Sequence, residues 1–577
     1  MTNEAKKITG YPSIDKPWLN FYPEEEISQI SMPEGSMYAY LLDNNKDALD
    51  DLALIYFGTK VSYRKMFENI DSAAAAFSSL GVAKGDIVAV MLPNIPENIY
   101  AIYGLNKIGA IADMIDLRSK NDTLKHYLNT TKAKVAVVCD LFADNVFEVE
   151  QDTFLEKIIV VSVFEAMPQP VRTILGWKLG RNSIPSNAMK WKGFIKQGKS
   201  VTVTDSGTAD DSACIFHTSG TTGFPKGVVT TNLNANVMAL HGKIVPLRFE
   251  RGKRIMNQVP PFLAFNILCS MHLPLALHMQ MVLLPEYRPD KFAKNIIKTK
   301  ATCCLAGPAD WGNFLEDSKE LTKSQNLSIL INPVCGSDAL PTEKRKAINK
   351  VLQSHGCETE IFEGYGMTEI GSAACCNMPG HVVDGSVGIP FCFNSFCIYD
   401  NETEQELKYG QIGEICMTGP TVMKEYYNEP EETAKVLRRH KDGVMWLHSG
   451  DIGYIDESGN IFLEGRLKRI IVRHDGIKVS PFSIEKIILD QTQVSACCVV
   501  GANDNEHGRG QVPVAFVAID NNEQIELDPI RHICESELAE NYWPKEYRAI
   551  AQLPLTANGK VDYRTLENIA NNEITKG

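Results

Sequence analysis

The sequence lacks a hydrophobic run long enough to cross a membrane. Its longest apolar segment, residues 268–285, is interrupted by two histidines, a proline and a glutamine. We expect this segment to form a core helix followed by a strand. The first residues of the chain are mostly polar and lead into no apolar stretch, so no secretory signal is expected. The sequence therefore predicts a cytoplasmic protein without a transmembrane segment.

Metal-binding cysteine spacing and an excess of basic residues are also missing. There are 15 cysteines, some in adjacent pairs such as Cys303 and Cys304, but none forms a C-x-x-C motif. Most of them lie within apolar runs, which is typical of buried free thiols in a reducing compartment. The formal net charge is -13, which argues against general nucleic-acid binding, because that activity needs a basic face.

What is present is a long alternation of helical and strand patterns. The 577 residues exceed the size of one ordinary core, so several structural units are expected. Helical spacing and continuous β-rich runs alternate over residues 63–76, 87–92, 97–108, 135–138 and 158–163. This alternation predicts an α/β fold with parallel sheets covered on both faces.

The pattern of predicted strands and helices changes twice towards the C-terminus. Shorter strands with glycine turns predict a small β subdomain over about residues 390–465, within a large N-terminal body of residues 1–467 that holds two α/β sheets. From about residue 469 to residue 577, strands again alternate with helices. This pattern predicts a separate small α+β C-terminal domain.

Residues 165–200 interrupt the alternation with a local basic excess. They carry seven basic residues against one acidic residue, interleaved with Trp177, Trp191 and Phe194. Two interpretations are open. The composition favours a solvated connection packed by its tryptophans, and the alternative is a peripheral surface that touches anionic lipid or an acidic carrier protein.

The densest stretch of phosphate-binding chemistry is residues 218–227, which follow a short apolar run that reads as a buried strand. Glycines can turn backbone N–H groups inward, and hydroxyls and an ammonium add further donors to phosphate oxygens. Pro225 precedes the lysine and Gly227 follows it, so the stretch is not a Walker loop. We predict that it holds a polyphosphate through Thr218, Ser219, Gly220, Thr221, Thr222, Gly223 and Lys226.

The ordered string of this loop resembles the signature of the adenylate-forming superfamily, which includes acyl-CoA synthetases, aryl-CoA ligases, luciferases and adenylation domains of peptide synthetases. Residues 364–369, Gly-Tyr-Gly-Met-Thr-Glu, resemble the second signature of that family. The resemblance implies that Tyr365 lies against adenine and that the neighbouring Gly366 belongs to the same nucleotide site. It implies that the Thr368 hydroxyl forms a hydrogen bond with the α-phosphate and that Glu369 coordinates Mg²⁺. It also implies that Gly336 and Ser337 border the adenine and acyl pockets.

Three further motifs follow in the order of the family. Residues 446–451 place the Asp451 carboxylate at a strand end, where the preceding glycine suggests a turn. The resemblance implies that Asp451 accepts the ribose hydroxyls and that Arg466 is a second nucleotide contact. Lys560 matches the lysine of the last motif, which bridges the carboxylate and the α-phosphate; an ammonium placed between two anions stabilises the adenylation transition state. In the family the C-terminal domain turns about a hinge, here Lys468, and coenzyme A passes near Gly476 and Lys478.

The resemblance implies a ligase that activates a carboxylic acid with Mg-ATP through an acyl-adenylate and then forms a thioester. The catalytic residues would be Lys226, Thr368, Glu369 and Lys560. Phe262, Leu263 and Phe265 would line an apolar acyl pocket, which favours a medium- or long-chain fatty acid over an aryl acid.

Two alternatives to a coenzyme A ligase stay open. A stand-alone adenylating enzyme would pass the acyl group to the phosphopantetheine of a separate carrier protein. A non-catalytic nucleotide-binding regulator would keep the loop without the chemistry, although the joint presence of Glu369, Asp451, Arg466 and Lys560 argues against it.

Overall fold

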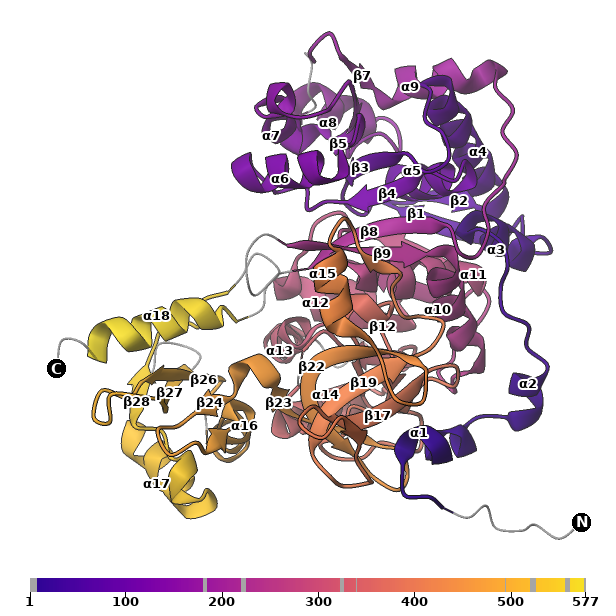
Figure 1. Cartoon of the computed structure of the whole chain (residues 1–577). Coiled ribbons are helices and arrows are strands. Elements are labelled where there is room, and N and C mark those ends of the chain that lie inside the picture. Colours follow the sequence, from indigo (N-terminus) through magenta and orange to yellow (C-terminus); the bar gives the residue numbers. More distant parts are fainter. Residues whose placement is uncertain are drawn as a thin grey trace, which may run out of the picture.

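The computed structural model describes residues 8–179, 184–218, 225–321, 326–338, 340–492, 494–518, 526–555 and 561–574. Three large sheets are stacked from one end of the molecule to the other, and a smaller C-terminal unit lies beside the third (Figure 1). The α/β fold class expected from the alternation is confirmed, with two α/β sheets, a small β subdomain and a C-terminal α+β unit.

The eight-stranded sheet has the order β20-β9-β8-β4-β3-β5-β6-β7, and its strands from β8 to β7 pair in parallel. The antiparallel hairpin of β8 and β9 frames the predicted phosphate loop. The strands are β3 (Ile87–Met91), β4 (Ile111–Met114), β5 (Val135–Cys139), β6 (Lys157–Val161), β7 (Ala188–Lys190), β8 (Ser212–Thr218), β9 (Lys226–Thr231) and β20 (Glu425–Tyr426). The accompanying helices are α4 (Tyr63–Ser79), α5 (Pro96–Lys107), α6 (Asn121–Thr131), α7 (Ala143–Phe147), α8 (Val171–Leu179) and α9 (Trp191–Gln197).

The nine-stranded sheet has the order β16-β15-β14-β13-β12-β10-β11-β1-β2 and is antiparallel only near its two edges. Its strands are β1 (Leu52–Tyr56), β2 (Thr59–Ser62), β10 (Arg254–Asn257), β11 (Gln280–Leu283), β12 (Cys303–Ala306), β13 (Asn332–Cys335), β14 (Phe362–Tyr365), β15 (Cys375–Cys376) and β16 (Ile389–Pro390). Its helices are α3 (Met37–Asn45), α10 (Asn232–Ile244), α11 (Leu273–Ala276), α12 (Phe292–Thr299), α13 (Pro308–Asp317) and α14 (Thr342–Ser354).

The β subdomain is an antiparallel sheet of six strands. They are β17 (Ser395–Asp400), β18 (Gln405–Glu406), β19 (Gly413–Thr418), β21 (Leu437–Arg439), β22 (Met445–Ile455) and β23 (Ile461–Arg466), and α15 (Pro430–Val436) precedes β21. The N-terminal segment begins beside this sheet with α1 (Pro12–Asp15) and then runs along the body through α2 (Glu24–Ser28) (Figure 1). Ser13 donates from its backbone N–H to Glu406 of β18 at 3.0 Å, which fixes that segment to the sheet.

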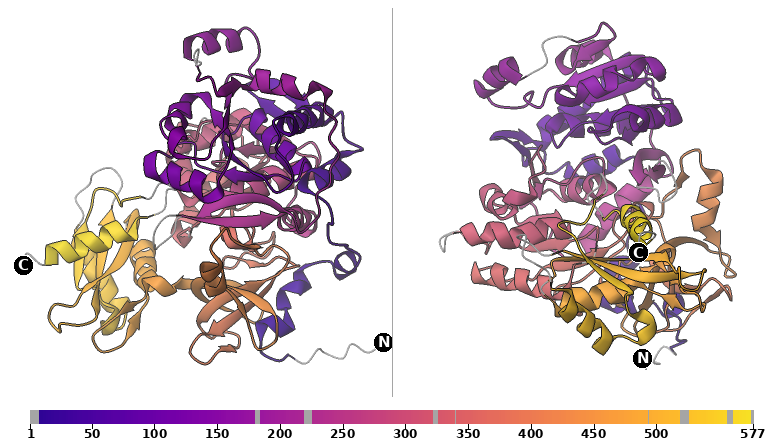
Figure 2. Two further views of the ribbon diagram at one scale, coloured as in Figure 1. Left: turned by 45° about the horizontal axis from the view of Figure 1, so that its top comes forward. Right: turned by 90° about the vertical axis from the view of Figure 1, so that its left-hand side faces the viewer.

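In its described residues the C-terminal unit contains a short hairpin, a three-stranded sheet and three α-helices, and it projects to one side of the body (Figure 2). Its elements are β24 (Ile471–Val472), β25 (Lys478–Val479), α16 (Pro481–Gln491), β26 (Ala496–Asn503), β27 (Gln511–Ala518), α17 (Leu527–Glu537), β28 (Glu546–Ala549) and α18 (Tyr563–Ile574).

Residues 165–200, the segment with the basic excess, lie partly against the body and partly away from it. Its strand β7 extends the eight-stranded sheet, and Trp191 of α9 is buried. Helix α8 stands off the body (Figure 2, left), and the Trp177 side chain is 75% exposed. The expectation of a connection packed by its tryptophans therefore holds for Trp191 and is wrong for Trp177.

Helix α5 is buried along its whole length and carries one carboxyl group into the core. Glu97 lies in its first turn and is buried, and Glu97 Oε2 has no hydrogen-bond partner among the described residues. Burial raises the pKa of Glu97 from 4.5 to about 8, because a charged carboxylate is poorly solvated in the core. The folded protein therefore keeps this proton at neutral pH.

The buried carboxyl of Glu97 predicts a pH-dependent stability. Between pH 4.5 and about 8 the folded chain binds a proton that the unfolded chain releases, so the free energy of unfolding falls as the pH rises. We expect Glu97→Gln to be more stable than the parent at neutral pH. Its advantage should grow by at most about 2.7 kcal/mol between about pH 5.5 and about pH 7.5 in urea unfolding. An advantage that is equal at both pH values would contradict this account.

Candidate active site

The β8–β9 hairpin carries the two described ends of the predicted phosphate loop. Thr218 and Lys226 are paired in register at the end of this hairpin, and Thr218 Oγ1 lies 3.5 Å from the Lys226 carbonyl oxygen. The intervening predicted residues Ser219, Gly220, Thr221, Thr222 and Gly223 lie outside the described residues.

The Lys226 ammonium reaches out of this hairpin towards a helix and a tyrosine. Its Nζ atom forms an ion pair with Glu432 of α15 and lies 4.9 Å from the centroid of the Tyr426 ring. Both side chains of the ion pair are partly exposed. The cation is therefore held by a carboxylate that a bound phosphate could replace.

A buried carboxylate lies on the other side of Tyr426. Glu369 is in the short 3-10 turn Thr368–Ile370, and its exposed fraction is 7%. The Tyr426 hydroxyl donates to Glu369 Oε1 at 2.7 Å, and burial together with this carboxylate raises the pKa of Tyr426. Tyr426 thus connects the predicted phosphate lysine with the predicted metal ligand, and Thr368 lies beside it in the same turn.

A second polar cluster joins β14 to β22 and β23. The Tyr365 hydroxyl donates to Asp451 Oδ2 at 2.7 Å, and Arg466 Nε lies 2.7 Å from Asp451 Oδ1. Asp451 is buried, whereas more than half of the Arg466 side chain is exposed. Burial and the Asp451 charge raise the pKa of Tyr365 well above its ordinary value. The predicted adenine and ribose contacts therefore lie together.

The position of Asp451 in its strand corrects one expectation. The sequence predicts this carboxylate at a strand end, but it lies in the middle of β22, directly opposite Arg466 of β23. The strand continues because Gly450 takes a φ of +73°, which a glycine adopts without strain. The glycine that suggested a turn therefore forms an irregularity inside the strand.

One glycine lets backbone segments meet just after β14, and a second glycine follows β13. A Cβ atom on Gly366 would lie 2.1 Å from the Ser372 carbonyl oxygen, so this position accepts only glycine. A Cβ atom on Gly336 would lie 3.6 Å from Phe265 Cζ, and Ser337 follows with a φ of +79°. The turn predicted to border adenine therefore lies against one of the predicted acyl-pocket residues.

The three predicted acyl-pocket residues lie where a loop enters an unusual helix. Phe262 is buried, and Leu263 and Phe265 are partly buried. A π-helix spans Phe265–His272, and such helices occur frequently at functional sites. The Asn266 side chain anchors its first turn by donating to Asn257 Oδ1 at 2.8 Å.

The predicted hinge and thiol residues lie at the junction with the C-terminal unit. Lys468 is in the 3-10 turn Leu467–Arg469, directly after β23. Gly476, with a φ of +84°, turns the β24–β25 hairpin. Lys478 Nζ lies 2.9 Å from Glu402 Oε1 in an exposed ion pair, which contributes little to stability. Lys560 lies outside the described residues.

Sequence reasoning missed Tyr426 and Glu432, which hold Glu369 and Lys226. Residues 425–432 place an aromatic pair before an acidic run, and this pattern is common on solvated surfaces. The contact becomes apparent only in the fold, because β20 pairs with β9 and so places Tyr426 near Lys226.

Comparison with protein families covers most of the chain. The model described as AMP-binding enzyme matches residues 42–427. The chain belongs to the AMP-binding enzyme family. A second model, AMP-binding enzyme C-terminal domain, matches residues 483–560 of this AMP-binding enzyme. The resemblance expected from the motifs is therefore confirmed, and the chain is an adenylate-forming, acyl-CoA synthetase-like enzyme.

The relatives of this AMP-binding enzyme extend over nearly its whole length. It is 29% identical over 562 residues to the long-chain-fatty-acid–CoA ligase of Bacillus subtilis (strain 168), covering 96% of this chain and 97% of the relative. It is 28% identical to the probable 4-coumarate–CoA ligase 1 of Dictyostelium discoideum, covering 95% and 97%. Both are named as CoA ligases, the second as a probable one.

Solved structures support the fold of the AMP-binding enzyme. The anthranilate CoA ligase AuaEII in complex with anthranoyl-AMP superposes with a TM-score of 0.81 at 21% identity, covering 95% of this chain and 99% of that chain. ATP-bound MatB from Rhodopseudomonas palustris gives a TM-score of 0.79 at 24% identity, covering 92% and 98%.

Proposed function

We propose that the protein joins a carboxylic acid to coenzyme A in two steps driven by ATP. The carboxylate attacks the α-phosphorus of ATP and expels pyrophosphate, and the thiol then attacks the acyl carbon and expels AMP. The observation that carries this proposal is the convergence of Tyr365, Asp451 and Arg466 beside the turn that holds Glu369. No protein nucleophile is needed, so the enzyme acts by positioning and electrostatics.

In this mechanism each cluster binds one part of ATP. The buried Asp451 carboxylate accepts the ribose hydroxyls, while Tyr365 lies against adenine and Arg466 adds a second contact. Thr368 donates to the α-phosphate. The β8–β9 loop and Lys226 bind the outgoing phosphates once the Lys226 ammonium leaves Glu432. Gly336 and Ser337 close the adenine side of the site.

The residues around Glu369 fit a Mg²⁺ ion. Mg²⁺ prefers one or two carboxylates together with phosphate oxygens and water, and Glu369 offers one buried carboxylate that Tyr426 orients through a single oxygen. Glu369 would hold the ion, which neutralises phosphate charge when it is bound.

We also propose that the C-terminal domain, residues 469–577, moves relative to the body, residues 1–467. Lys468 lies in a short turn between the β subdomain and the β24–β25 hairpin, which suits a hinge. In one arrangement Lys560 stabilises adenylation; in the other Gly476 and Lys478 line the path of the thiol.

A medium- or long-chain fatty acid is the substrate that we favour. The name of the Bacillus subtilis relative supports it, and so does the apolar wall of Phe262, Leu263 and Phe265 beside Gly336. The names of the 4-coumarate and anthranilate ligases keep aryl acids as the competing class.

Product analysis with a panel of acids tests the proposed function. The protein is mixed with Mg-ATP and fatty or aryl acids of graded length, with and without coenzyme A. We expect AMP, pyrophosphate and acyl-CoA with one fatty-acid length preferred. Pyrophosphate release that coenzyme A cannot accelerate would indicate a carrier protein as acceptor. No turnover of ATP with any acid would contradict the proposal.

We further propose that α8 makes a peripheral contact with an anionic lipid surface. Val171, Ile174 and Trp177 recur along one side of α8 and are exposed, and the surrounding segment has a basic excess. Such a helix face suits the interface of an anionic bilayer. Among the described residues, no helix is long and apolar enough to span a membrane.

Vesicle sedimentation tests the contact proposed for α8. We expect Trp177→Ser to weaken binding to anionic vesicles about tenfold, because a large apolar side chain no longer enters the interface. Reversing the charges of Lys192, Lys196 and Lys199 should also weaken it, whereas Phe154→Ser, at another exposed aromatic residue, should not. Equal binding by all variants would contradict the contact.

A further inference from the structure

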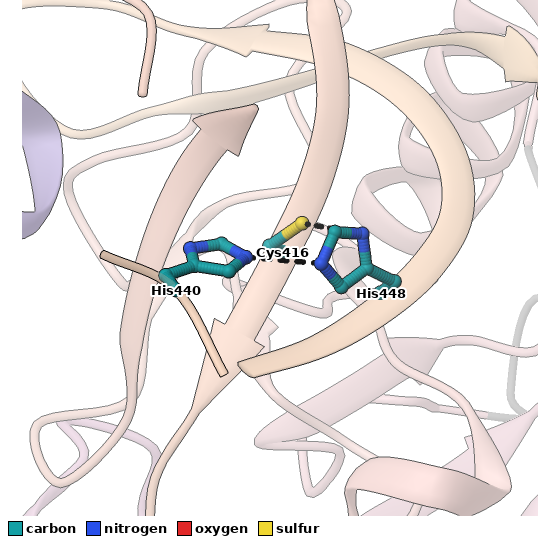
Figure 3. Close-up of side chains that lie close together, drawn as sticks. All are labelled: Cys416, His440 and His448. Carbon is teal, nitrogen blue, oxygen red and sulfur yellow. Dashed lines mark hydrogen bonds between the residues drawn. The ribbon is translucent and has the colours of Figure 1, made fainter. Parts of the chain in front are cut away.

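A cluster of one cysteine and two histidines lies in the β subdomain, outside the proposed ATP site. Cys416 of β19 and His448 of β22 are direct neighbours across the two strands. His440 lies in the turn between β21 and β22 and reaches the same place, so that two strands and a turn contribute one side chain each (Figure 3). Their ligand atoms all lie within 4.8 Å of one another. These residue types are those that bind zinc.

The His448 ring is contacted at Nδ1 by Cys416 Sγ, at 3.5 Å, and is oriented by a carboxylate at the same nitrogen. Its Nδ1 atom lies 2.7 Å from Glu414 Oε2, and Asn401 Nδ2 donates to the same oxygen at 2.8 Å. A histidine ligand commonly donates its second ring N–H to a carboxylate, which leaves the other nitrogen free for the metal. Here that other nitrogen, Nε2, faces His440 Nε2 at 2.9 Å.

The His440 ring is held in place by aromatic stacking. It is stacked on Tyr399, with 4.0 Å between centroids and 20° between planes, and on Trp446 at 5.4 Å and 17°. The planes of His440 and His448 are 72° apart. The two rings are therefore not stacked on each other, and their Nε2 atoms face each other at 2.9 Å.

We propose that Cys416, His440 and His448 form a zinc site, with Glu414 as the carboxylate that orients His448. Binding breaks the Cys416 S–H bond, forms a sulfur–zinc bond and releases one proton to solvent. Tetrahedral zinc with bonds of about 2.0–2.1 Å separates two nitrogen ligands by about 3.3 Å, so His440 shifts by a few tenths of an ångström. Water occupies the fourth position.

The surroundings give the ion access and a structural consequence. A cavity of about 150 Å³ gives solvent access to His440 and His448. Its lining also includes Tyr399, Asn401 and Glu404 and three basic residues, Arg438, Arg439 and Lys441. Glu414 Oε1 also accepts the Gly450 N–H at 2.9 Å, one residue before Asp451. Zinc would therefore tie the hairpin of β21 and β22 to the sheet next to the proposed ribose contact.

A second group, His474, Asp504 and His507, offers a matched comparison. Both histidines direct Nδ1 at Asp504 Oδ2, at 3.0 and 2.8 Å, but their rings are stacked with only 5° between planes and 3.5 Å between centroids. A single ion cannot lie in both ring planes of a parallel stack. This group therefore serves as the control for the experiment.

The experiment measures metal binding by the full chain after removal of metals with a chelator. Zinc is titrated against a competing indicator, and cobalt is added separately for its absorption spectrum. We expect one equivalent of zinc, a rise in the unfolding temperature, and cobalt bands typical of tetrahedral ligation with a thiolate. His440→Ala and Cys416→Ser should lose these signals, and Glu414→Gln should bind zinc about 10–100-fold more weakly.

His507→Ala should bind zinc like the parent, because it changes only the comparison group. Absence of zinc binding by the parent chain overturns the proposal. So does binding that survives in both His440→Ala and Cys416→Ser. His440 is on a partly exposed turn, so its variant remains informative if Cys416→Ser fails to fold. These measurements do not use the ligase reaction, so they can fail without bearing on the proposed function.

Discussion

Glu369→Gln is expected to lower the rate of adenylate formation by about 10²–10³-fold, the effect typical of removing one group that stabilises transition-state charge. Glu369 is buried, and glutamine has nearly the same shape, so the fold should be kept while the charge for Mg²⁺ is lost. Acid-dependent exchange of pyrophosphate into ATP measures the rate. Exchange at the parental rate would contradict the role of Glu369.

Tyr426→Phe is the matched variant for this prediction. It removes the hydroxyl that donates to Glu369 Oε1 but leaves the carboxylate. Loss of such an orienting partner typically costs about 10–100-fold in metal affinity or activity, so the Mg²⁺ concentration for half-maximal exchange should rise. An exchange rate that falls equally at all Mg²⁺ concentrations would indicate damage to the fold instead.

Lys560→Gln is expected to have an effect at least as large, but on only one half-reaction. The proposal assigns the Lys560 ammonium to the adenylation transition state, so adenylate formation should fall by about 10²–10³-fold or more. Conversion of a supplied acyl-adenylate to acyl-CoA should stay close to the parental rate. Equal loss of both half-reactions would refute this division of labour.

Lys545→Gln is the control for the lysine variant. Lys545 also belongs to the C-terminal unit, where its Nζ atom forms an exposed ion pair with Glu506. Such pairs contribute about 0–1 kcal/mol. Both half-reactions should therefore keep their parental rates in this variant, and a loss would point to a general effect of removing charge.

The regular strands and helices were predictable because each has a hydrophobic pattern that is visible in its own residues. Ile87–Met91 and Val135–Cys139 are largely buried strands rich in β-branched residues, and Tyr63–Ser79 has apolar residues at helical spacing. The π-helix at Phe265–His272 was not predictable beyond a core helix, because its apolar residues fit several helical periods and packing selects one.

The site was predictable where a local motif specifies chemistry and unpredictable where tertiary contacts create it. Tyr365, Asp451 and Arg466 were expected to serve one nucleotide, and they lie in contact. Glu432 pairs with Lys226 across 206 positions of sequence, and no local pattern predicts this. His440 likewise becomes a candidate ligand only in the folded chain, where it follows β21 and lies next to His448 of β22.

Oxygen transfer tests the central claim, carboxylate attack on the α-phosphorus, most directly. The protein is given its best acid with both carboxyl oxygens replaced by oxygen-18, together with Mg-ATP and coenzyme A, and the products are analysed by mass spectrometry. The account predicts one heavy oxygen in AMP and none in pyrophosphate. Heavy oxygen in the pyrophosphate, or AMP without label, would contradict an acyl-adenylate and with it the proposed mechanism.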